Sequence, residues 1–427
     1  MTRVIRETRS VCPVCLKNIP ARLSRGSDGK IVLEKACPDH GSFRVPVWAG
    51  KLDFEQWLLG TEPLAEGSGL NCPGNCGICP EHEIGTCCAL LEVTQRCNLR
   101  CRYCFADGGL KDTEPSLEEC REAIRGIVRQ CGQPLLQLSG GEPTLRDDLP
   151  ELVRFAKETG CSYTQVNTNG IRIAEEPDYA KRLKEAGLDI VFLQFDGTED
   201  EIYEALRGRP LLETKLEAIR VCSELRIGVT LVPTVVRGVN DQNLGAIVAL
   251  AAKLAPGVRG IHFQPVSYFG RYPSAPAAEE RYTLDQLMAD LSDQAQIPVE
   301  SFMPSRCDHP LCGFHAIFLI DPKGGLRPLS SITHSSHSRG CARDNREYVV
   351  RHWRRAPEEP QPNADYSEEM DFDTFLYRLR HNSLTLSAMA FQDAGNLNIE
   401  RLHRCTLHVY DHGSIKPFCA RYLSPMS

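Results

Sequence analysis

Between residues 88 and 300 the sequence alternates between short apolar runs and longer stretches that carry apolar residues at helical spacing. The short runs predict strands and the longer stretches predict helices, so this part of the chain contains six consecutive β/α repeats. Such repeats form parallel strands joined by right-handed crossovers. We therefore expect an α/β fold with an open three-quarter barrel related to the (β/α)8 form, which binds ligands at the carboxyl ends of its strands. The predicted strands are Ala89–Thr94, Leu135–Ser139, Tyr163–Thr168, Ile190–Phe195, Val229–Val235 and Gly260–Val266, and the predicted helices are Leu117–Gln130, Leu149–Thr159, Tyr179–Ala186, Leu211–Glu224 and Leu244–Leu254.

Three cysteines follow the first predicted strand at the spacing C-x3-C-x2-C, namely Cys97, Cys101 and Cys104. Cysteine thiolates hold iron–sulfur clusters, usually four to a cubane. A cubane held by three thiolates keeps one open iron, which can bind a substrate or cofactor. The alternatives are a closed zinc knuckle that borrows a fourth ligand, and three buried thiols without a metal.

The string Leu-Glu-Val-Thr-Gln-Arg-Cys-Asn-Leu-Arg-Cys-Arg-Tyr-Cys-Phe, residues 91–105, resembles the signature of the radical S-adenosylmethionine (radical SAM) superfamily. The aromatic residue before the last cysteine, Tyr103, is also typical of that family. The resemblance implies a partial (β/α)6 radical SAM barrel. It also implies a [4Fe-4S] cluster whose open iron chelates the amino and carboxylate groups of SAM, and reductive cleavage of SAM to a 5′-deoxyadenosyl radical.

The second predicted strand ends in Leu-Ser-Gly-Gly-Glu-Pro, residues 138–143, which matches the GGEP motif of the same family. In the family this motif binds the amino group of SAM, which implies the same role for Gly140, Gly141, Glu142 and Pro143. Glycines allow the backbone to approach a ligand closely, and a carboxylate such as Glu142 accepts strong hydrogen bonds from an ammonium. The alternative is an ordinary Gly-Gly turn followed by a solvated glutamate.

Polar residues also end the third and fourth predicted strands, where the active sites of barrel enzymes lie. Asn167, Asn169 and Asp196 are candidates to contact the ribose or carboxylate of SAM, or the substrate. For each of them, turn capping is the alternative role. Residues 233–240, His262 and Gln264 are weaker candidates on the last two strands.

Charge and cysteine content narrow the possible functions. The chain has 49 Lys and Arg against 56 Asp and Glu, a formal charge of −7, so no nucleic-acid partner is expected. It lacks an apolar run of about 18 residues, so no membrane span is expected. The first residues do not resemble a signal peptide. The 20 cysteines fall in clusters with metal-ligand spacing rather than a disulfide framework. We therefore expect a cytoplasmic protein in a reducing and anoxic setting.

The first 50 residues predict a small module with one metal ion. Cys12, Cys15, Cys37 and His40 form a C-x2-C and a C-x2-H knuckle, a tetrahedral site for zinc or a rubredoxin-like iron. A zinc ribbon that binds nucleic acid is the alternative, and the net negative charge counts against it.

A second C-x3-C-x2-C motif lies in residues 51–87, a segment rich in proline and glycine without a preceding strand. Cys72, Cys76 and Cys79, with Cys87 or Cys88 as the fourth ligand, predict an auxiliary [4Fe-4S] cluster. The alternative is a zinc site with His82 as a ligand.

The region 301–427 holds a third group of cysteines. Cys405 and Cys419 flank a strand–turn–strand pattern that would bring them together, and Cys307 and Cys312 complete a possible second auxiliary [4Fe-4S] cluster. Four unrelated buried cysteines are the alternative. Cys341 follows a Ser/His-rich stretch, Ser330–Ser338, and is a possible exchangeable ligand. Cys120, Cys131, Cys161 and Cys222 have no partners and are predicted core residues.

Together, the cysteine motifs at 12–15, 37–41, 72–82, 307–312 and 415–419 are similar to the tetraether lipid synthase branch of the superfamily. That resemblance implies one mononuclear metal site, the SAM-binding cluster and two auxiliary clusters. It also implies that the radical abstracts hydrogen from a substrate and couples sp3 carbons of lipid chains.

Two other functions stay open. One is radical SAM methyl or carbon transfer to a small heterocycle such as a pterin, and the other is a non-catalytic iron–sulfur electron-transfer scaffold. We expect a small-molecule or lipid substrate and a low-potential donor of ferredoxin or flavodoxin type. The expected domains are 1–50, 51–87, 88–300 and 301–427.

Overall fold

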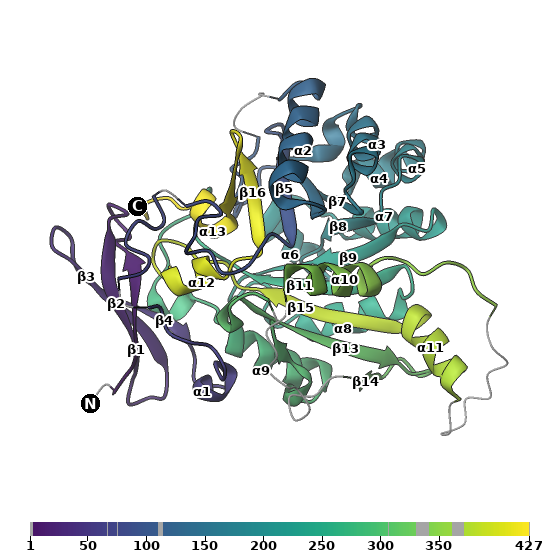
Figure 1. The fold of residues 1–427 in the computed structure, drawn as a ribbon. Coiled ribbons are helices and arrows are strands. Elements are labelled where there is room, and N and C mark those ends of the chain that lie inside the picture. The colour runs from purple at the N-terminus through teal and green to yellow at the C-terminus, as the bar shows by residue number, and fades with distance from the viewer. Residues whose placement is uncertain are drawn as a thin grey trace.

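The computed structural model describes residues 3–65, 67–74, 76–109, 114–305, 307–329, 341–360 and 371–426. The Ser/His-rich stretch 330–338 lies outside these residues. The described parts form a four-stranded antiparallel sheet near the N-terminus and a 13-stranded mixed sheet covered by helices (Figure 1). In the described parts, no helix is both long and apolar enough to cross a membrane.

The centre of the large sheet consists of six parallel strands that lie side by side in chain order, which confirms the predicted β/α repeats. The sheet does not close into a full barrel among the described residues, so the partial barrel is confirmed as well. The six strands are β5 (Cys88–Thr94), β6 (Leu135–Gly140), β7 (Tyr163–Thr168), β8 (Ile190–Gln194), β9 (Gly228–Val232) and β11 (Val258–Pro265), and the short β10 (Thr234–Val235) pairs with β11.

The predicted helices are present as α2 (Leu117–Cys131), α3 (Leu149–Thr159), α5 (Pro177–Glu185), α7 (Leu212–Glu224) and α8 (Leu244–Lys253). Their apolar faces pack on the sheet in one core, which includes Cys120, Cys161 and Cys222 as predicted. The start of α2 shows why a helix begins there, because Ser116 and Glu119 form a reciprocal capping box. Two short helices were not predicted, α4 (Ile171–Glu175) and α6 (Asp200–Arg207).

The C-terminal region adds strands to both edges of the six-stranded unit. On one edge β15 (Ser383–Met389) pairs with β11, followed by β13 (Gly313–Ile320) with β12 (Met303–Pro304) and β14 (Leu326–Pro328). On the other edge β16 (Leu407–Asp411) pairs with β5 and forms a hairpin with β17 (Ser414–Pro417). The predicted C-terminal hairpin is therefore confirmed. The predicted boundary at residue 300 runs through one continuous sheet.

Short helices and 3-10 turns complete the described fold. Two of the helices have neighbours that are important below. Helix α10 lines a cavity of the large sheet, and helix α12 contacts β1 of the N-terminal sheet. These elements are α1 (Phe54–Trp57), α9 (Leu284–Ala295), α10 (Ala342–Trp353), α11 (Phe372–His381), α12 (Ile399–His403), α13 (Phe418–Arg421), η1 (Pro143–Leu145), η2 (Ala278–Glu280), η3 (Val299–Ser301) and η4 (Pro310–Cys312).

The N-terminal module is an antiparallel sheet that lies against the C-terminal helix α12 (Figure 1). Ser10 donates to the carbonyl of Leu397 at 2.5 Å, and the ammonium of Lys35 donates to the carbonyl of Ala394 at 2.7 Å. Burial lowers the pKa of Lys35 to about 7. These buried bonds fix the module to the body of the protein. The strands of the module are β1 (Arg3–Val11), β2 (Asn18–Arg25), β3 (Ile31–Cys37) and β4 (Gly41–Trp48).

Candidate active site and metal-binding groups

A cavity of about 360 Å³ lies inside the partial barrel, and Cys97, Cys101 and Cys104 line it. Side chains that alternate along the strands point into it, as expected for one face of a sheet. Most of these strands contribute hydrogen-bonding groups. The polar residues of the strands on the wall are Gln137, Ser139, Gln165, Asn167, Thr168, Gln194, Thr234, His262, Gln264 and Ser387.

The loop with the three cysteines is fastened by two arginines that the sequence did not single out. Arg271 exchanges both backbone hydrogen bonds with Cys104 at 2.9 Å, and its side chain donates to the carbonyl of Cys101 at 2.9 Å. Arg207, the last residue of α6, donates to the carbonyl of Tyr103 at 3.4 Å. These bonds fasten the backbone of the loop at Cys101, Tyr103 and Cys104.

The three thiols suit an iron–sulfur cluster chemically. Burial, together with the charges of Glu142, Cys101 and Cys104, raises the pKa of Cys97 to about 12. Burial also raises the pKa of Cys104. Thiolates in such surroundings need a cation, and bound iron deprotonates its thiol ligands. Three thiols on one loop, beside a cavity, therefore match a cluster with one open iron.

The Glu142 carboxylate organises the motif after β6. It is 2% exposed, and its Oε1 accepts from Thr144 N at 3.0 Å, from Thr144 Oγ1 at 2.6 Å and from Thr168 Oγ1 at 2.7 Å. Its Oε2 accepts from Asn169 N at 2.7 Å. Oε2 thus accepts one hydrogen bond from the described residues, against three at Oε1, which leaves Oε2 room for a further donor. Contact with the amino group of SAM therefore stays a prediction for Glu142, and Pro143 beside it is the first residue of η1.

Gly140 and Gly141 bring this motif against the start of the cysteine loop. Gly140 has a φ of +121°, and a Cβ there would lie 2.2 Å from the carbonyl oxygen of Thr94. A Cβ on Gly141 would lie 2.1 Å from the carbonyl oxygen of Arg96. Glycine is therefore required at both positions by the close contact between two segments of the protein, whether or not a ligand binds there.

Replacing Gly141 with alanine should destabilise the protein and impair assembly of the cluster. Overpacking of this kind typically costs about 1–3 kcal/mol, because the backbone must move. The measurement is the midpoint of urea unfolding together with the iron content after anaerobic reconstitution. Gly85→Ala is the control, since a Cβ at that position meets only Ala342 Cβ at 4.0 Å. Equal midpoints and equal iron contents in the two variants would contradict the prediction.

The three candidate residues at the ends of β7 and β8 differ in what they offer a ligand. Asn167 donates to Ser139 Oγ at 3.4 Å, and its buried Oδ1 has no hydrogen-bond partner among the residues that the structure describes. Asn169 is bonded to Asn98 at 2.7 Å and accepts from Ile171 N at 3.0 Å. Asn167 is therefore ready to accept a hydrogen bond from a ligand, whereas Asn169 ties the cysteine loop to β7.

Asp196 is bonded within the protein, through a buried ion pair with Arg207. The guanidinium donates Nε–H to Oδ2 at 2.6 Å and Nη2–H to Oδ1 at 2.7 Å. Thr234 N also donates to this carboxylate at 3.1 Å. Nearby, Lys215 donates to Gln194 Oε1 at 2.8 Å, and burial lowers its pKa to about 7. Arg207 lines the cavity, as do Glu142, Asp308 and Asp344, and contact of Asp196 with SAM or substrate stays a prediction.

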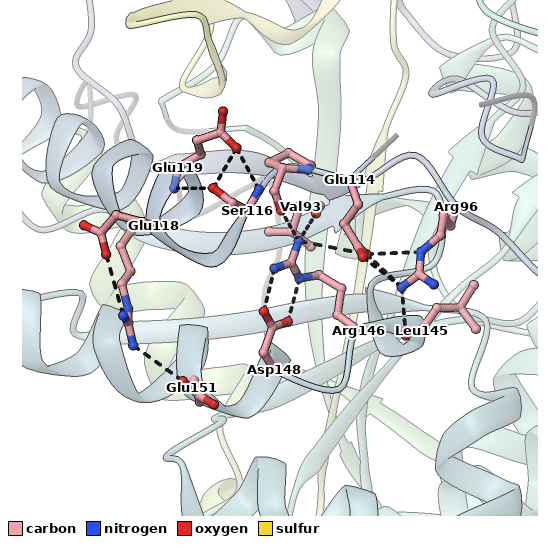
Figure 2. A network of polar contacts seen from close by, with 12 residues as sticks. Val93, Arg96, Glu114, Ser116, Glu118, Glu119, Leu145, Arg146, Asp148 and Glu151 are labelled. Atoms are coloured by element: carbon pink, nitrogen blue, oxygen red, sulfur yellow. Dashed lines mark hydrogen bonds and ion pairs between the residues drawn. The ribbon is translucent and has the colours of Figure 1, made fainter. Parts of the chain in front are cut away.

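A second polar network lies around Arg146 and includes Arg96, the residue before Cys97 (Figure 2). Arg146 forms a bidentate ion pair with Asp148 at 2.7 and 2.8 Å, and donates to the carbonyl of Val93 at 2.9 Å. Arg96 donates to the carbonyl of Leu145 at 3.2 Å. The network joins the end of β5 to the segment after the GGEP motif, and so links the two loops that meet at the cavity.

The four predicted ligands of the N-terminal module come together as predicted. Cys12 Sγ and Cys37 Sγ lie 3.6 and 3.5 Å from His40 Nδ1, and the sulfurs of Cys15 and Cys37 are 3.9 Å apart. A tetrahedral zinc ion with bonds of about 2.3 Å to sulfur and 2.0 Å to nitrogen places two sulfurs about 3.8 Å apart and sulfur and nitrogen about 3.5 Å apart. The group therefore has the dimensions of a single-ion site.

The structure brings only part of the second motif together. Cys72 Sγ lies 3.8 Å from Cys76 Sγ, and the ionisable neighbours of Cys76 also include Cys79 and Cys405. Those of Cys87 are instead Cys88, Asp308 and Cys307. The predicted fourth ligand, Cys87 or Cys88, therefore belongs to another group. The reason is that Cys88 begins β5 and lines the barrel cavity, whereas Cys72 lies outside the barrel.

His82 does not complete the second motif either, because its Nε2 lies 2.8 Å from the Cys405 carbonyl and 3.1 Å from His408 Nε2.

The third predicted group is divided as well. Cys312, Cys405 and Cys419 influence one another electrostatically, and burial raises the pKa of Cys419 to about 12. Cys307 instead donates to the carbonyl of Cys341 at 2.9 Å and lines the barrel cavity with Cys87 and Cys88. The described thiols therefore form two separate groups here, and neither group matches the predicted set of four.

Comparisons with known proteins fit this geometry. The radical SAM superfamily matches residues 91–251, and the HMPTM N-terminal zinc ribbon domain matches residues 4–49. The chain thus belongs to the radical SAM superfamily, whose enzymes use a [4Fe-4S] cluster and SAM. The predicted radical SAM family and the N-terminal zinc ribbon are confirmed, and the role of Cys97, Cys101 and Cys104 as cluster ligands stays a prediction.

One relative spans nearly the whole chain. The 7,8-dihydro-6-hydroxymethylpterin dimethyltransferase of Methanocaldococcus jannaschii is 32% identical over 97% of this chain and 92% of its own length. A probable GTP 3′,8-cyclase of Thermococcus kodakarensis is 35% identical over 38% of this chain and 52% of its own length. Streptococcus suis SuiB bound to S-adenosylmethionine has a TM-score of 0.39 at 14% identity, over 51% of this chain and 48% of that chain. The expected tetraether lipid synthase branch gains no support from these relatives.

Proposed function

We propose that this radical SAM enzyme transfers methyl groups to a planar, nitrogen-rich heterocycle of the pterin type. The observation that carries the proposal is the set of amide side chains on the wall of the cavity beside Cys97, Cys101 and Cys104. The full-length relative named for a pterin substrate supports it. The proposal adopts the heterocycle alternative from the sequence in place of lipid coupling.

The amides offer hydrogen-bond donors and acceptors on the wall of the cavity in which a substrate would bind. Gln165 donates to Gln137 Oε1 at 2.8 Å, which orients both side chains. Asn167 keeps a free buried acceptor, and Gln264 also faces the cavity. The ring edges of a pterin carry N–H, C=O and ring nitrogen groups that pair with amides. A saturated lipid chain would leave the amides unpaired, which costs free energy in a buried site.

Aromatic rings form the other part of the wall. Phe192 and Trp353 have ring centroids 5.5 Å apart, and His262 lies 5.8 Å from Trp353. Burial lowers the pKa of His262 to about 4, so the ring is neutral at physiological pH and accepts or donates a hydrogen bond. Flat apolar surfaces beside a few placed polar groups are typical of sites for planar ligands.

When bound, the cluster and SAM supply a 5′-deoxyadenosyl radical. The chain's own residues would do three things. Cys97, Cys101 and Cys104 would hold the cluster at one end of the cavity, and Gly140 to Pro143 would hold the amino group of SAM. The enclosed barrel would keep water from the reaction. A low-potential donor of ferredoxin or flavodoxin type would provide the electron. We also propose that two further groups of cysteines bind a metal ion or cluster. One consists of Cys312, Cys405 and Cys419, and the other of Cys307, Cys87 and Cys88.

The test uses anaerobically purified full-length protein with reconstituted cluster, SAM and dithionite. We expect 5′-deoxyadenosine in every active mixture, and a methylated product by mass spectrometry when 7,8-dihydro-6-hydroxymethylpterin is added. A joined product from archaeal-type isoprenoid lipids, with none from the pterin, would overturn the pterin proposal. Absence of both SAM binding and 5′-deoxyadenosine would instead favour an electron-transfer scaffold.

Replacing Gln165 with leucine should weaken binding of the heterocycle more than it slows cleavage of SAM. Loss of one neutral hydrogen bond of about 0.5–1.5 kcal/mol corresponds to roughly a 2- to 13-fold rise in KM. The change also removes the amide donor to Gln137 Oε1 and leaves only the weaker thiol donor of Cys88 at 3.3 Å, so the upper part of this range is expected. Gln130→Leu, on the exposed end of α2, is the matched control. An unchanged KM in the Gln165 variant would contradict the assigned role.

A further inference from the structure

The loop that carries Cys97, Cys101 and Cys104 reaches the surface of the protein. All three thiols are half-buried. The side chains on either side of Cys101 in the sequence, Arg100 and Arg102, are exposed. A cluster held by this loop would therefore lie close to solvent on the side of the two arginines, where another protein can approach it.

A third exposed arginine lies beside the same loop. The Arg102 backbone N–H donates to the carbonyl of Leu206 at 2.9 Å, which joins the loop to the end of α6. Shortly after Leu206 the chain reaches Arg209, whose side chain is exposed as well. We call Arg100, Arg102 and Arg209 the arginine rim.

The positive charge of the arginine rim is not neutralised by the protein. None of its three guanidinium groups forms an ion pair within the part of the chain that the structure describes. The acids beside the loop are already bound to other arginines, since Asp107 pairs with Arg271 at 3.1 Å and Glu114 with Arg96 at 2.9 Å. Glu204, an exposed acid of α6, makes no described ion pair with the rim. The three charges are therefore available to a partner.

The arginine rim contrasts with the charge of the whole chain. The formal charge is −7, so the chain as a whole repels a negatively charged protein. Three uncompensated arginines attract such a protein to one place and orient it there. Attraction of this kind acts mainly on the rate of association and weakens as salt is added.

We propose that the arginine rim is the docking surface for an acidic, low-potential electron carrier of the ferredoxin type. This inference rests on the proposed function, in which each cleavage of SAM consumes one electron. A reduced ferredoxin docked on the rim would be oxidised by one electron, and the cluster beside Cys101 would be reduced by it, with no bond made or broken. A ferredoxin carries its own electron on a cluster whose thiolate ligands are negative, and it suits the anoxic setting that the cysteines predict.

The experiment measures the Kd of an acidic 2[4Fe-4S] ferredoxin for the full-length, cluster-loaded enzyme by calorimetry at low and high salt. The test variant combines Arg100→Gln, Arg102→Gln and Arg209→Gln. We expect it to bind roughly 3- to 150-fold more weakly at low salt, the loss that corresponds to three exposed ion pairs. Binding by the wild type should weaken at high salt, and the difference between the two proteins should shrink.

The matched control loses the same amount of charge elsewhere on the surface. It replaces three exposed arginines on β1, α3 and β14 with glutamine, namely Arg3, Arg154 and Arg327. The control should keep the wild-type Kd. An unchanged Kd in the test variant, or equal weakening in both variants, would overturn the proposal. Rim-dependent binding of a flavodoxin, with none of ferredoxin, would overturn the choice of carrier.

A second measurement separates docking from damage to the cluster. Formation of 5′-deoxyadenosine is followed with dithionite, which needs no docking surface, and with ferredoxin that has been reduced beforehand and freed of dithionite. We expect the test variant to match the wild type with dithionite and to be slower with ferredoxin. An equal loss with both reductants would overturn the proposal. A wild-type enzyme that is inactive with dithionite would contradict the proposed function instead, and the ferredoxin Kd would still decide the role of the rim.

Discussion

Replacing Cys101 with alanine should reduce the formation of 5′-deoxyadenosine to the level of a mixture without protein. Cys101 is the middle of the three thiols beside the cavity, and its carbonyl is held by Arg271 at 2.9 Å. With two thiolates left, the cluster loses one of its protein ligands and is not retained. The measurement is 5′-deoxyadenosine by chromatography after anaerobic incubation with SAM and dithionite, together with iron content.

Cys131→Ala is the matched control for this prediction. Cys131 is also a half-buried thiol, but it lies at the end of α2 and packs against the main core. Its removal should leave both iron content and 5′-deoxyadenosine formation near the wild-type values. A Cys101 variant with wild-type activity would show that another group of cysteines holds the cluster that cleaves SAM.

Arg207→Gln should be the most destabilising of the charge substitutions proposed here. The Arg207 side chain is 6% exposed and its partner Asp196 is fully buried, so the substitution leaves an uncompensated carboxylate in the interior. Breaking a buried pair in this way typically costs about 3–5 kcal/mol. Because Arg207 also holds the carbonyl of Tyr103, we expect a lower cluster content too. Urea unfolding of samples with matched metal content measures the first effect, and iron analysis the second.

The double variant Arg207→Gln with Asp196→Asn separates the two effects. Removing both charges should restore much of the stability, because no unpaired ion stays buried. The support for Tyr103 should remain lost. Arg220→Gln, on the exposed face of α7, should have little effect on either quantity, since its partners Glu217 and Glu224 are solvated. A single variant at Arg207 that is as stable as this control would contradict the prediction.

The parallel core could be predicted because its information is local. Each apolar run is bounded by turn residues, and each helix has its own apolar face, so the repeats appear without knowledge of the rest of the chain. The same is true of the cysteine loop and the Gly-Gly-Glu-Pro turn, whose residues are neighbours in sequence. The strand β15 could not be predicted this way, because Ser383–Met389 gains its place by pairing with β11 and β13 from distant parts of the chain.

Long-range contacts also explain why several residues of the site could not be predicted from the sequence. Arg207 ends a helix of eight residues, where a charged side chain is usually solvated, and nothing local shows that it turns toward Asp196. Arg271 lies in a loop after β11 and meets the cysteine loop only in the folded barrel. For the cysteines, spacing identified the motifs but not their partners. His403 reaches Cys72 from α12, whereas the nearby Cys87 and Cys88 face the barrel.

The order of strands in the large sheet has a consequence for how the chain matures. The six parallel strands are synthesised first, and the strands that cover their two outer edges, β15 and β16, are synthesised last. Unpaired strand edges are templates for association between chains, and pairing of distant segments is slow. A newly made barrel therefore carries two exposed edges until β15 and β16, which lie outside the six repeats, have been synthesised.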